Sequence, residues 1–163
     1  MGSRRAQIRF TDEEAAAFLA AERTVTCATI GRDGRPHLMP LWYVVRPSGP
    51  GGRGELWAWT FARSQKVRNL ERDPRATLQV EAGETYDQLR GIMLQCDAVL
   101  HRDADDVLAL GVEIASRYAP EEASIDPDAL AELLRAQAAK RIAIQFAEVR
   151  RSSWDHRKLG GSY

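Results

Sequence analysis

The sequence predicts a mainly β protein, a six-stranded antiparallel barrel with helical insertions, and three observations support this prediction. Short runs rich in β-branched and aromatic residues recur along the chain, several with alternating apolar positions. Turn residues separate these runs, and Asp33-Gly34 is the sharpest hairpin signal. Segments with the helical spacing of apolar residues lie between the strands. Hairpin-joined strands with helices between them are typical of a small barrel that its own side chains fill.

The first elements are a helix and a β-hairpin. The helix covers Thr11–Glu22, and its first residue and Glu14 have the spacing of a capping box. Strands are then predicted at Thr24–Ile30 and His37–Val45. Pro40 lies inside the second strand and cannot donate a ladder hydrogen bond. We therefore expect an edge, a bulge or a break in pairing there.

The later elements follow from the same periodicity, turn residues and helix caps. A loop over residues 47–52 leads to a strand at Glu55–Phe61, and Pro74 ends the short helix that opens at Ser64. The elements that follow are strands at Arg75–Ala82 and Gly91–His101, helices at Asp103–Tyr118 and Asp126–Lys140, and a last strand at Arg141–Arg150.

Length and composition indicate a single domain over residues 1–163, with residues 1–10 as a flexible N-terminus. Lys plus Arg and Asp plus Glu number 23 each, so the charge balance argues against a nucleic-acid-binding protein. No apolar run approaches the roughly 20 residues of a membrane span, and no apolar signal core follows Met1. These features predict a cytoplasmic protein that has no membrane partner.

The two cysteines, Cys27 and Cys96, each lie in an apolar strand-like run, which indicates buried thiols in a reducing compartment. The sequence has no Cys-x-x-Cys pair and no His/Cys cluster, so no metal site is predicted. We also find no triad, carboxylate dyad or activated nucleophile, and we assign no catalytic residue.

The start of the short helix is the best candidate for a ligand site. Ser64, Gln65 and Lys66 would place a hydroxyl, an amide and an ammonium beside the unpaired N–H groups of the first helical turn. That combination suits a phosphate. On the residues alone, a solvated lysine and a simple N-cap serine explain the pattern about as well.

The strand before this helix is rich in aromatic residues. Trp57 and Trp59 share one face of the strand, whereas Ala58 and Thr60 share the other. If a ligand lies on the Thr60 side, the tryptophans are packing groups. If it lies on the opposite side, Trp59 is a ligand neighbour, and periodicity leaves both alternatives open.

Three segments resemble the flavin/deazaflavin oxidoreductases, relatives of pyridoxamine 5′-phosphate oxidase with an FMN-binding split β-barrel. They are Thr26-Cys27-Ala28-Thr29-Ile30-Gly31-Arg32-Asp33-Gly34-Arg35-Pro36-His37, Met39-Pro40-Leu41-Trp42-Tyr43 and the run from Ser64 to Arg75. The closing Ser153-Trp154-Asp155-His156-Arg157-Lys158-Leu159 is similar to a B-type branch, many members of which use coenzyme F-420, an 8-hydroxy-5-deazaflavin.

The resemblance implies a homodimer with two cofactors across the subunit interface. It implies that Ser64, Gln65 and Lys66 hold the ribityl phosphate, and that Trp59 and Thr60 approach the ribityl chain. The segment Met39, Pro40, Leu41 and Trp42 would line the ring. It implies no residue for the ring's other face, and the sequence has neither the substrate-phosphate site nor the C-terminus of true pyridoxamine phosphate oxidases.

The leading functional hypothesis is an F-420-dependent oxidoreductase that transfers a hydride between the reduced coenzyme and an unsaturated small organic substrate. FMN in the same site is an alternative, because both cofactors carry a ribityl phosphate. A third hypothesis is a non-catalytic protein that binds a flavin or a tetrapyrrole. The basic run of Arg63, Arg68, Arg72 and Arg75 is either a solvated face or a receptor for the anionic F-420 tail.

Overall fold

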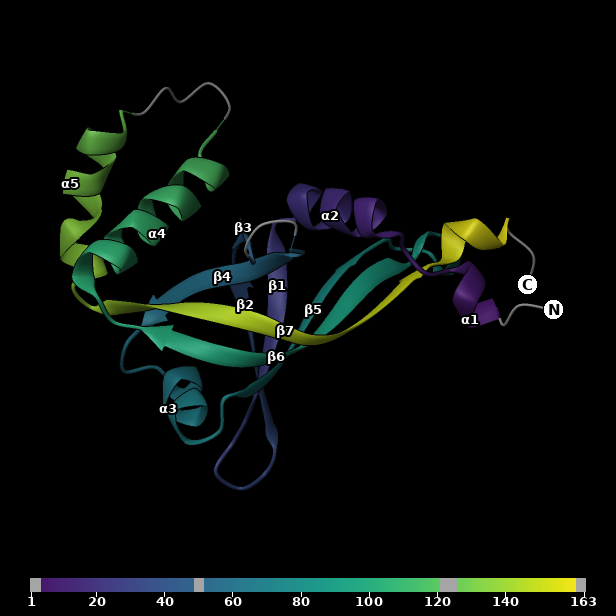
Figure 1. The fold of residues 1–163 in the computed structure, drawn as a ribbon, viewed down its shortest axis with the longest axis horizontal. Helices are drawn as coiled ribbons and strands as arrows, with labels where there is room; N and C mark the ends of the chain where they lie inside the picture. The colour runs from purple at the N-terminus through teal and green to yellow at the C-terminus, as the bar shows by residue number, and fades with distance from the viewer. Residues whose placement is uncertain (1–3, 49–51, 121–125, 161–163) are drawn as a thin grey trace.

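The computed structural model describes residues 4–48, 52–120 and 126–160, and its centre is one strongly curled antiparallel sheet (Figure 1). Residues 1–3 of the predicted N-terminus and residues 49–51 of the predicted loop lie outside the described residues. The sheet has seven strands in the order β2-β1-β5-β6-β7-β4-β3. They are β1 Thr24–Ile30, β2 Pro36–Trp42, β3 Val44–Pro47, β4 Gly54–Phe61, β5 Arg75–Ala82, β6 Arg90–His101 and β7 Arg141–Asp155.

The split β-barrel prediction is confirmed, and the seventh strand comes from the segment that contains Pro40. The predicted strand His37–Val45 is divided at Tyr43 into β2, which pairs with β1, and β3, which pairs with β4. These two strands are the opposite edges of the sheet. One continuous piece of chain therefore supplies both edges, and Pro40 lies in an edge strand, where its missing N–H is tolerated.

The junction at Tyr43 is held by a second tyrosine. Tyr43 is fully buried, and its N–H donates to the Tyr118 hydroxyl at 3.0 Å. The Tyr118 hydroxyl is in turn within donating distance of the Tyr43 carbonyl, at 3.0 Å, and of the Arg23 carbonyl. The N–H and C=O of Tyr43, the residue between the two edge strands, are thus satisfied by a side chain.

Helices close the barrel and cover one side of it. Apolar side chains of α2 (Asp12–Ala21) and α3 (Gln65–Arg72) belong to the same core cluster as the inward faces of the strands. In Figure 1 the two helices lie on opposite sides of the sheet. α4 (Ala104–Tyr118) and α5 (Pro127–Ala138) form a helical pair that packs outside β3, β4 and β7 around a second apolar cluster. The short elements are α1 (Arg4–Gln7), η1 (Tyr86–Gln88) and η2 (His156–Leu159).

The N-terminal residues contact the far end of β7, whereas the sequence predicts a flexible segment over residues 1–10. The Asp155 N–H donates to the Ile8 carbonyl at 2.7 Å, and the Phe10 N–H donates to the Ser153 hydroxyl at 3.0 Å.

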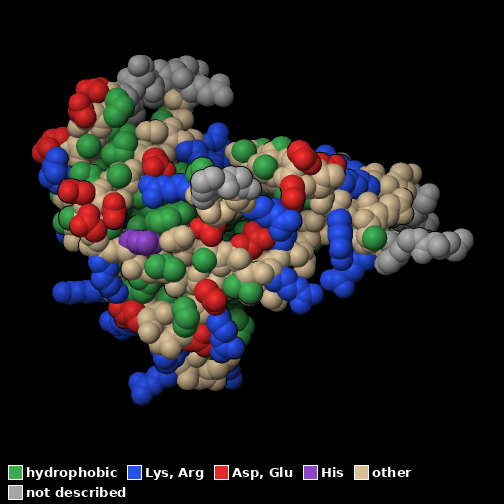
Figure 2. Space-filling model, in the orientation of Figure 1, with side chains coloured by type: hydrophobic (Ala, Val, Ile, Leu, Met, Phe, Trp, Pro, Cys, Tyr) green, Lys and Arg blue, Asp and Glu red, His purple; other side chains and the backbone are tan. Residues whose placement is uncertain are grey.

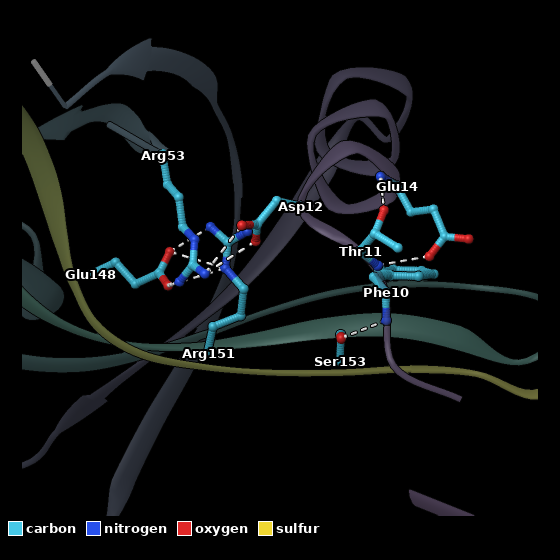
Figure 3. Close-up of polar contacts among 8 residues, drawn as sticks. All are labelled: Phe10, Thr11, Asp12, Glu14, Arg53, Glu148, Arg151 and Ser153. Carbon is cyan, nitrogen blue, oxygen red and sulfur yellow. Dashed lines mark hydrogen bonds and ion pairs between the residues drawn. The ribbon is translucent and has the colours of Figure 1, made fainter. Parts of the chain in front are cut away.

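The predicted capping box is confirmed, because the Thr11 hydroxyl accepts from the Glu14 N–H and the Glu14 carboxylate accepts from the Thr11 N–H (Figure 3). No helix in the described parts of the chain is long and apolar enough to cross a membrane.

Both cysteine side chains are buried, as predicted. Burial raises the pKa of the Cys27 thiol and of the Cys96 thiol to about 12 each. We expect neither thiol to react with a disulfide reagent at pH 8 in the folded protein, because the thiolate is the reactive species. Two thiols per chain should react after denaturation. Rapid labelling of the native protein would show that the barrel interior opens.

We expect Tyr118→Phe to destabilise the fold, because it removes the hydroxyl that satisfies the Tyr43 backbone. Leaving buried polar groups without a partner costs about 1–3 kcal/mol. The measurement is the urea midpoint of unfolding at unchanged slope. Leu133→Ala is the control, since Leu133 is 73% exposed on α5. Equal midpoints for the two variants would contradict this role of Tyr118.

Candidate functional site

The turn between β4 and α3 is tied to two strands. The Ser64 N–H donates to the Phe61 carbonyl at 3.0 Å, and the Ala62 N–H donates to the Lys140 carbonyl at 3.0 Å. The first bond closes the turn after β4, and the second fastens it to the residue before β7. The start of α3 is therefore fixed relative to both strands.

Ser64 is the N-cap of α3, but its side chain does not cap the helix. The Ser64 Oγ is buried and has no hydrogen-bond partner among the described residues. An N-cap serine ordinarily accepts a hydrogen bond from a first-turn N–H. Within the described residues the hydroxyl and the N–H groups of the first turn are therefore donors that no protein group uses, a combination that suits an anion.

Lys66 is unusually buried for a lysine, at 8% exposure. Its ammonium donates to the Thr60 hydroxyl at 3.0 Å, and it forms no ion pair with a carboxylate in the described ranges. Burial lowers the pKa of Lys66, the nearby Cys27 opposes that shift, and the positive charge of Arg141 adds to it. An ammonium has three donors, so two remain for an anion.

A buried polar chain holds α3 against β1. The Gln65 side-chain amide donates to the Asn69 carbonyl oxygen at 2.9 Å, and the Asn69 amide donates to the Thr29 hydroxyl at 3.0 Å. Asn69 and Thr29 are both buried. One of the two N–H donors of the Gln65 amide is thus engaged within the protein, and the Gln65 backbone N–H lies in the first helical turn, where it has no partner within the helix.

Arg141 is a site residue that the sequence analysis missed. Its guanidinium carbon lies 4.4 Å from the ring centroids of both Trp59 and Phe61. Its Nε is buried without a hydrogen-bond partner, and burial lowers its pKa. It also forms no ion pair within the described residues. No sequence signal distinguishes Arg141 from the other arginines, because the register that pairs it with Phe61 exists only in the sheet.

Trp59 and Thr60 lie on opposite faces of β4, and the structure separates their surroundings. Thr60 is buried and accepts the hydrogen bond from Lys66. The Trp59 ring packs closely against Gly111 of α4, where an added Cβ would lie 2.4 Å from the ring. Thr60 therefore faces the cation of α3, and Trp59 packs between α4 and Arg141.

The predicted ring-lining segment lies on the edge strand β2. Met39 and Trp42 are 41% and 57% exposed, Pro40 is exposed, and Leu41 points into the core. The Trp42 ring stacks on Tyr118 with centroids 4.5 Å apart. β2 contacts β4 where the curled sheet closes, which brings this segment towards the strand that leads to α3.

A cavity of about 300 Å³ lies between the β1–β2 turn and α3. His37, Gln65 and Asn69 are among its lining residues, and the His37 Nδ1 is buried without a partner. The three buried side-chain atoms that lack a partner in the described ranges are on His37, Ser64 and Arg141. His37 lines the cavity beside α3, Ser64 caps that helix, and Arg141 is close enough for its charge to lower the pKa of Lys66.

The four predicted arginines are not equivalent. Arg75 forms two hydrogen bonds with the Asp73 carboxylate, which holds the pKa of Asp73 at about 2. Arg72 donates to the Ile30 carbonyl and fastens α3 to β1. Arg63 and Arg68 are exposed and form no ion pair within the described ranges. Only these last two remain available to an anionic tail.

The family model for pyridoxamine 5′-phosphate oxidase matches residues 11–151. A crystal structure of the conserved hypothetical protein Rv2991 from Mycobacterium tuberculosis is 37% identical, with a TM-score of 0.85, and the match covers 99% of this chain and 95% of that one. No curated protein matches the sequence.

Two more distant structures share the fold. A structure named F420 reductase is 18% identical, with a TM-score of 0.58, over 83% of this chain and 94% of its own. The haem storage protein HutZ from Vibrio cholerae is 16% identical, with a TM-score of 0.62, over 88% of this chain and 92% of its own. At these identities the likeness concerns the fold alone.

Proposed function

This chain belongs to the pyridoxamine 5′-phosphate oxidase family, and from that premise we propose that it is an oxidoreductase that uses coenzyme F-420 and reduces an unsaturated small organic substrate. The observation that carries the proposal is the start of α3, where, among the residues that the structure describes, a buried serine hydroxyl has no hydrogen-bond partner and a buried lysine has no carboxylate partner. A buried positive charge without a counter-ion is unfavourable, so an anion there would stabilise the site.

The phosphate of a ribityl cofactor fits this group of donors. Lys66 would supply charge, Ser64 a hydroxyl donor, and the first turn of α3 its backbone N–H groups. Arg141 would add a second cation on the side of Trp59 and Phe61. When bound, the coenzyme would supply the hydride chemistry, whereas the protein binds and orients it and excludes water.

The edge strand β2 is the proposed neighbour of the ring. Its outer edge has no strand partner within the described chain, and Leu38, Met39 and Trp42 are between 41% and 57% exposed. An edge with free backbone groups and apolar side chains suits a flat heterocycle. We propose that a second copy of the chain covers the other side of the ring, which would make the enzyme a homodimer.

FMN remains the alternative cofactor, because Ser64 and Lys66 would contact the group that both cofactors share. F-420 continues beyond the phosphate into an anionic tail, and the exposed cations Arg63 and Arg68 favour it. We expect fluorescence titration of the purified protein to give tighter binding of F-420 than of FMN. Tight FMN binding with no binding of F-420 would reject the preference.

Lys66→Met should weaken cofactor binding about tenfold or more, because one charged hydrogen bond to phosphate contributes about 1.5–3 kcal/mol. Methionine keeps the apolar stem and therefore most of the packing. Lys140→Met removes an equal charge from an exposed position nearby and is the matched control. Calorimetric titration with F-420 measures both variants, and equal affinities would remove Lys66 from the site.

Turnover separates an enzyme from a carrier. We expect the protein to oxidise reduced F-420 in the presence of at least one member of a panel of enones, quinones and biliverdin. Turnover is measured as the gain of visible absorbance when the oxidised coenzyme forms. The control is the Lys66→Met variant, measured at a coenzyme concentration below the dissociation constant of that variant. Good binding without turnover across the panel would favour a non-catalytic flavin- or tetrapyrrole-binding protein.

A further inference from the structure

β7 is longer than β4, its neighbour on one side, and this leaves part of that edge of β7 without a strand partner in the described chain. β4 pairs with β7 only between Arg141 and Phe146, whereas β6 pairs with β7 as far as Asp155. From Ala147 onwards, no strand in the described chain joins β7 on its β4 side. A free sheet edge exposes backbone N–H and C=O groups that remain available to a ligand.

The N-terminal segment crosses this free edge but does not fill it. Its backbone is fixed by the bonds from Asp155 to Ile8 and from Phe10 to Ser153, the second of which is drawn in Figure 3. A cavity of about 670 Å³ lies between the segment, the start of β4 and the end of β7. Pockets for small molecules usually have volumes of about 300–1,000 Å³.

Arginines dominate the lining of this cavity, and two of them are held in place by carboxylates. Arg151 forms a bidentate pair with Glu148, in which each side chain is only 13% exposed. Arg53 reaches Asp12 at 3.1 Å and Glu148 at 3.9 Å (Figure 3). These two guanidiniums and two carboxylates balance in charge, and the pairing fixes where the guanidiniums lie.

Two further arginines, Arg9 and Arg150, give the cavity a surplus of positive charge. Arg9 and Arg150 are exposed, line the cavity and form no ion pair within the described residues, and Arg5 lines it as well. Figure 2 shows Lys and Arg side chains gathered at this end of the molecule. Because the whole chain has no net charge, this surplus is a local separation of charge.

One side of the cavity is apolar and flat. Trp154 pairs with Gly91 across the sheet, and a Cβ added at Gly91 would lie 2.4 Å from its ring. The indole therefore rests directly on the glycine backbone. Met93, which also lines the cavity, lies on the same face of β6 as Gly91. A flat aromatic surface beside guanidinium groups suits a planar anion.

We propose that this cavity is a binding site for a small planar organic dianion, carrying carboxylate or phosphate groups. The two surplus guanidiniums would take the negative charges, and Trp154 and Met93 would contact the planar part. The site is separate from the start of α3, since the cavity lies beside Arg150–Trp154 and α3 starts near Arg141, roughly 30–40 Å away along β7. The proposal does not depend on the proposed cofactor.

Calorimetric titration at low salt tests the proposal, with terephthalate and phenyl phosphate as the dianionic probes and terephthalamide as the uncharged control. We expect at least one dianion to bind and terephthalamide not to bind. The double variant Arg9→Gln/Arg150→Gln should weaken dianion binding about tenfold or more, because it removes two charged contacts. The tighter of the two probes identifies the preferred oxyanion.

Arg102→Gln/Arg135→Gln is the matched control variant, because it removes the same charge from two arginines that do not line the cavity. We expect it to change dianion affinity by less than about twofold. Circular dichroism checks that both variants are folded. Absence of binding by either dianion, or an equal loss in the two double variants, would overturn the proposal.

Discussion

The single-residue junction at Tyr43 is the constraint on which the fold depends, because the two edges of the sheet are consecutive pieces of chain. Its backbone belongs to neither strand pairing, and the Tyr118 hydroxyl satisfies it instead. The Tyr43 hydroxyl is bonded in turn to the Leu19 carbonyl near the end of α2. Arg117 adds hydrogen bonds to the Leu19, Ala20 and Glu22 carbonyls. One cluster thus joins the barrel closure, α2 and α4.

The candidate site lies at a place where the barrel interior becomes polar. Elsewhere these strand faces bury aliphatic side chains. Beside α3 they carry Thr29 and Thr60, which are hydrogen-bonded to Asn69 and Lys66 of the helix. The Asn69 amide donates to the Thr29 hydroxyl and the Lys66 ammonium donates to the Thr60 hydroxyl, whereas the ammonium charge has no counter-ion in the described chain. That imbalance sets this region apart from the rest of the packed core, because interior charges are ordinarily paired.

Sequence patterns located most elements to within a few residues, including the capping box at Thr11 and the long strand β6. They failed where pairing partners decide the outcome. The predicted strand through Pro40 is two strands, since its halves pair with β1 and β4 respectively. The last strand extends to Asp155 because β6 continues alongside it, and residues 4–10 are placed by contacts with that extension. Partners this distant along the chain leave no local signal.

The sequence by itself determined the strand periodicity, the helix caps and the polar residues that open α3, since these depend on neighbouring residues. Only the tertiary structure decided which face of β4 meets Lys66, because Trp59 and Thr60 alternate equally well on either side. It also brought Arg141 to Phe61 and left the Ser64 hydroxyl without a hydrogen-bond partner among the described residues. Such relations arise from register and burial, which depend on residues far apart in the chain.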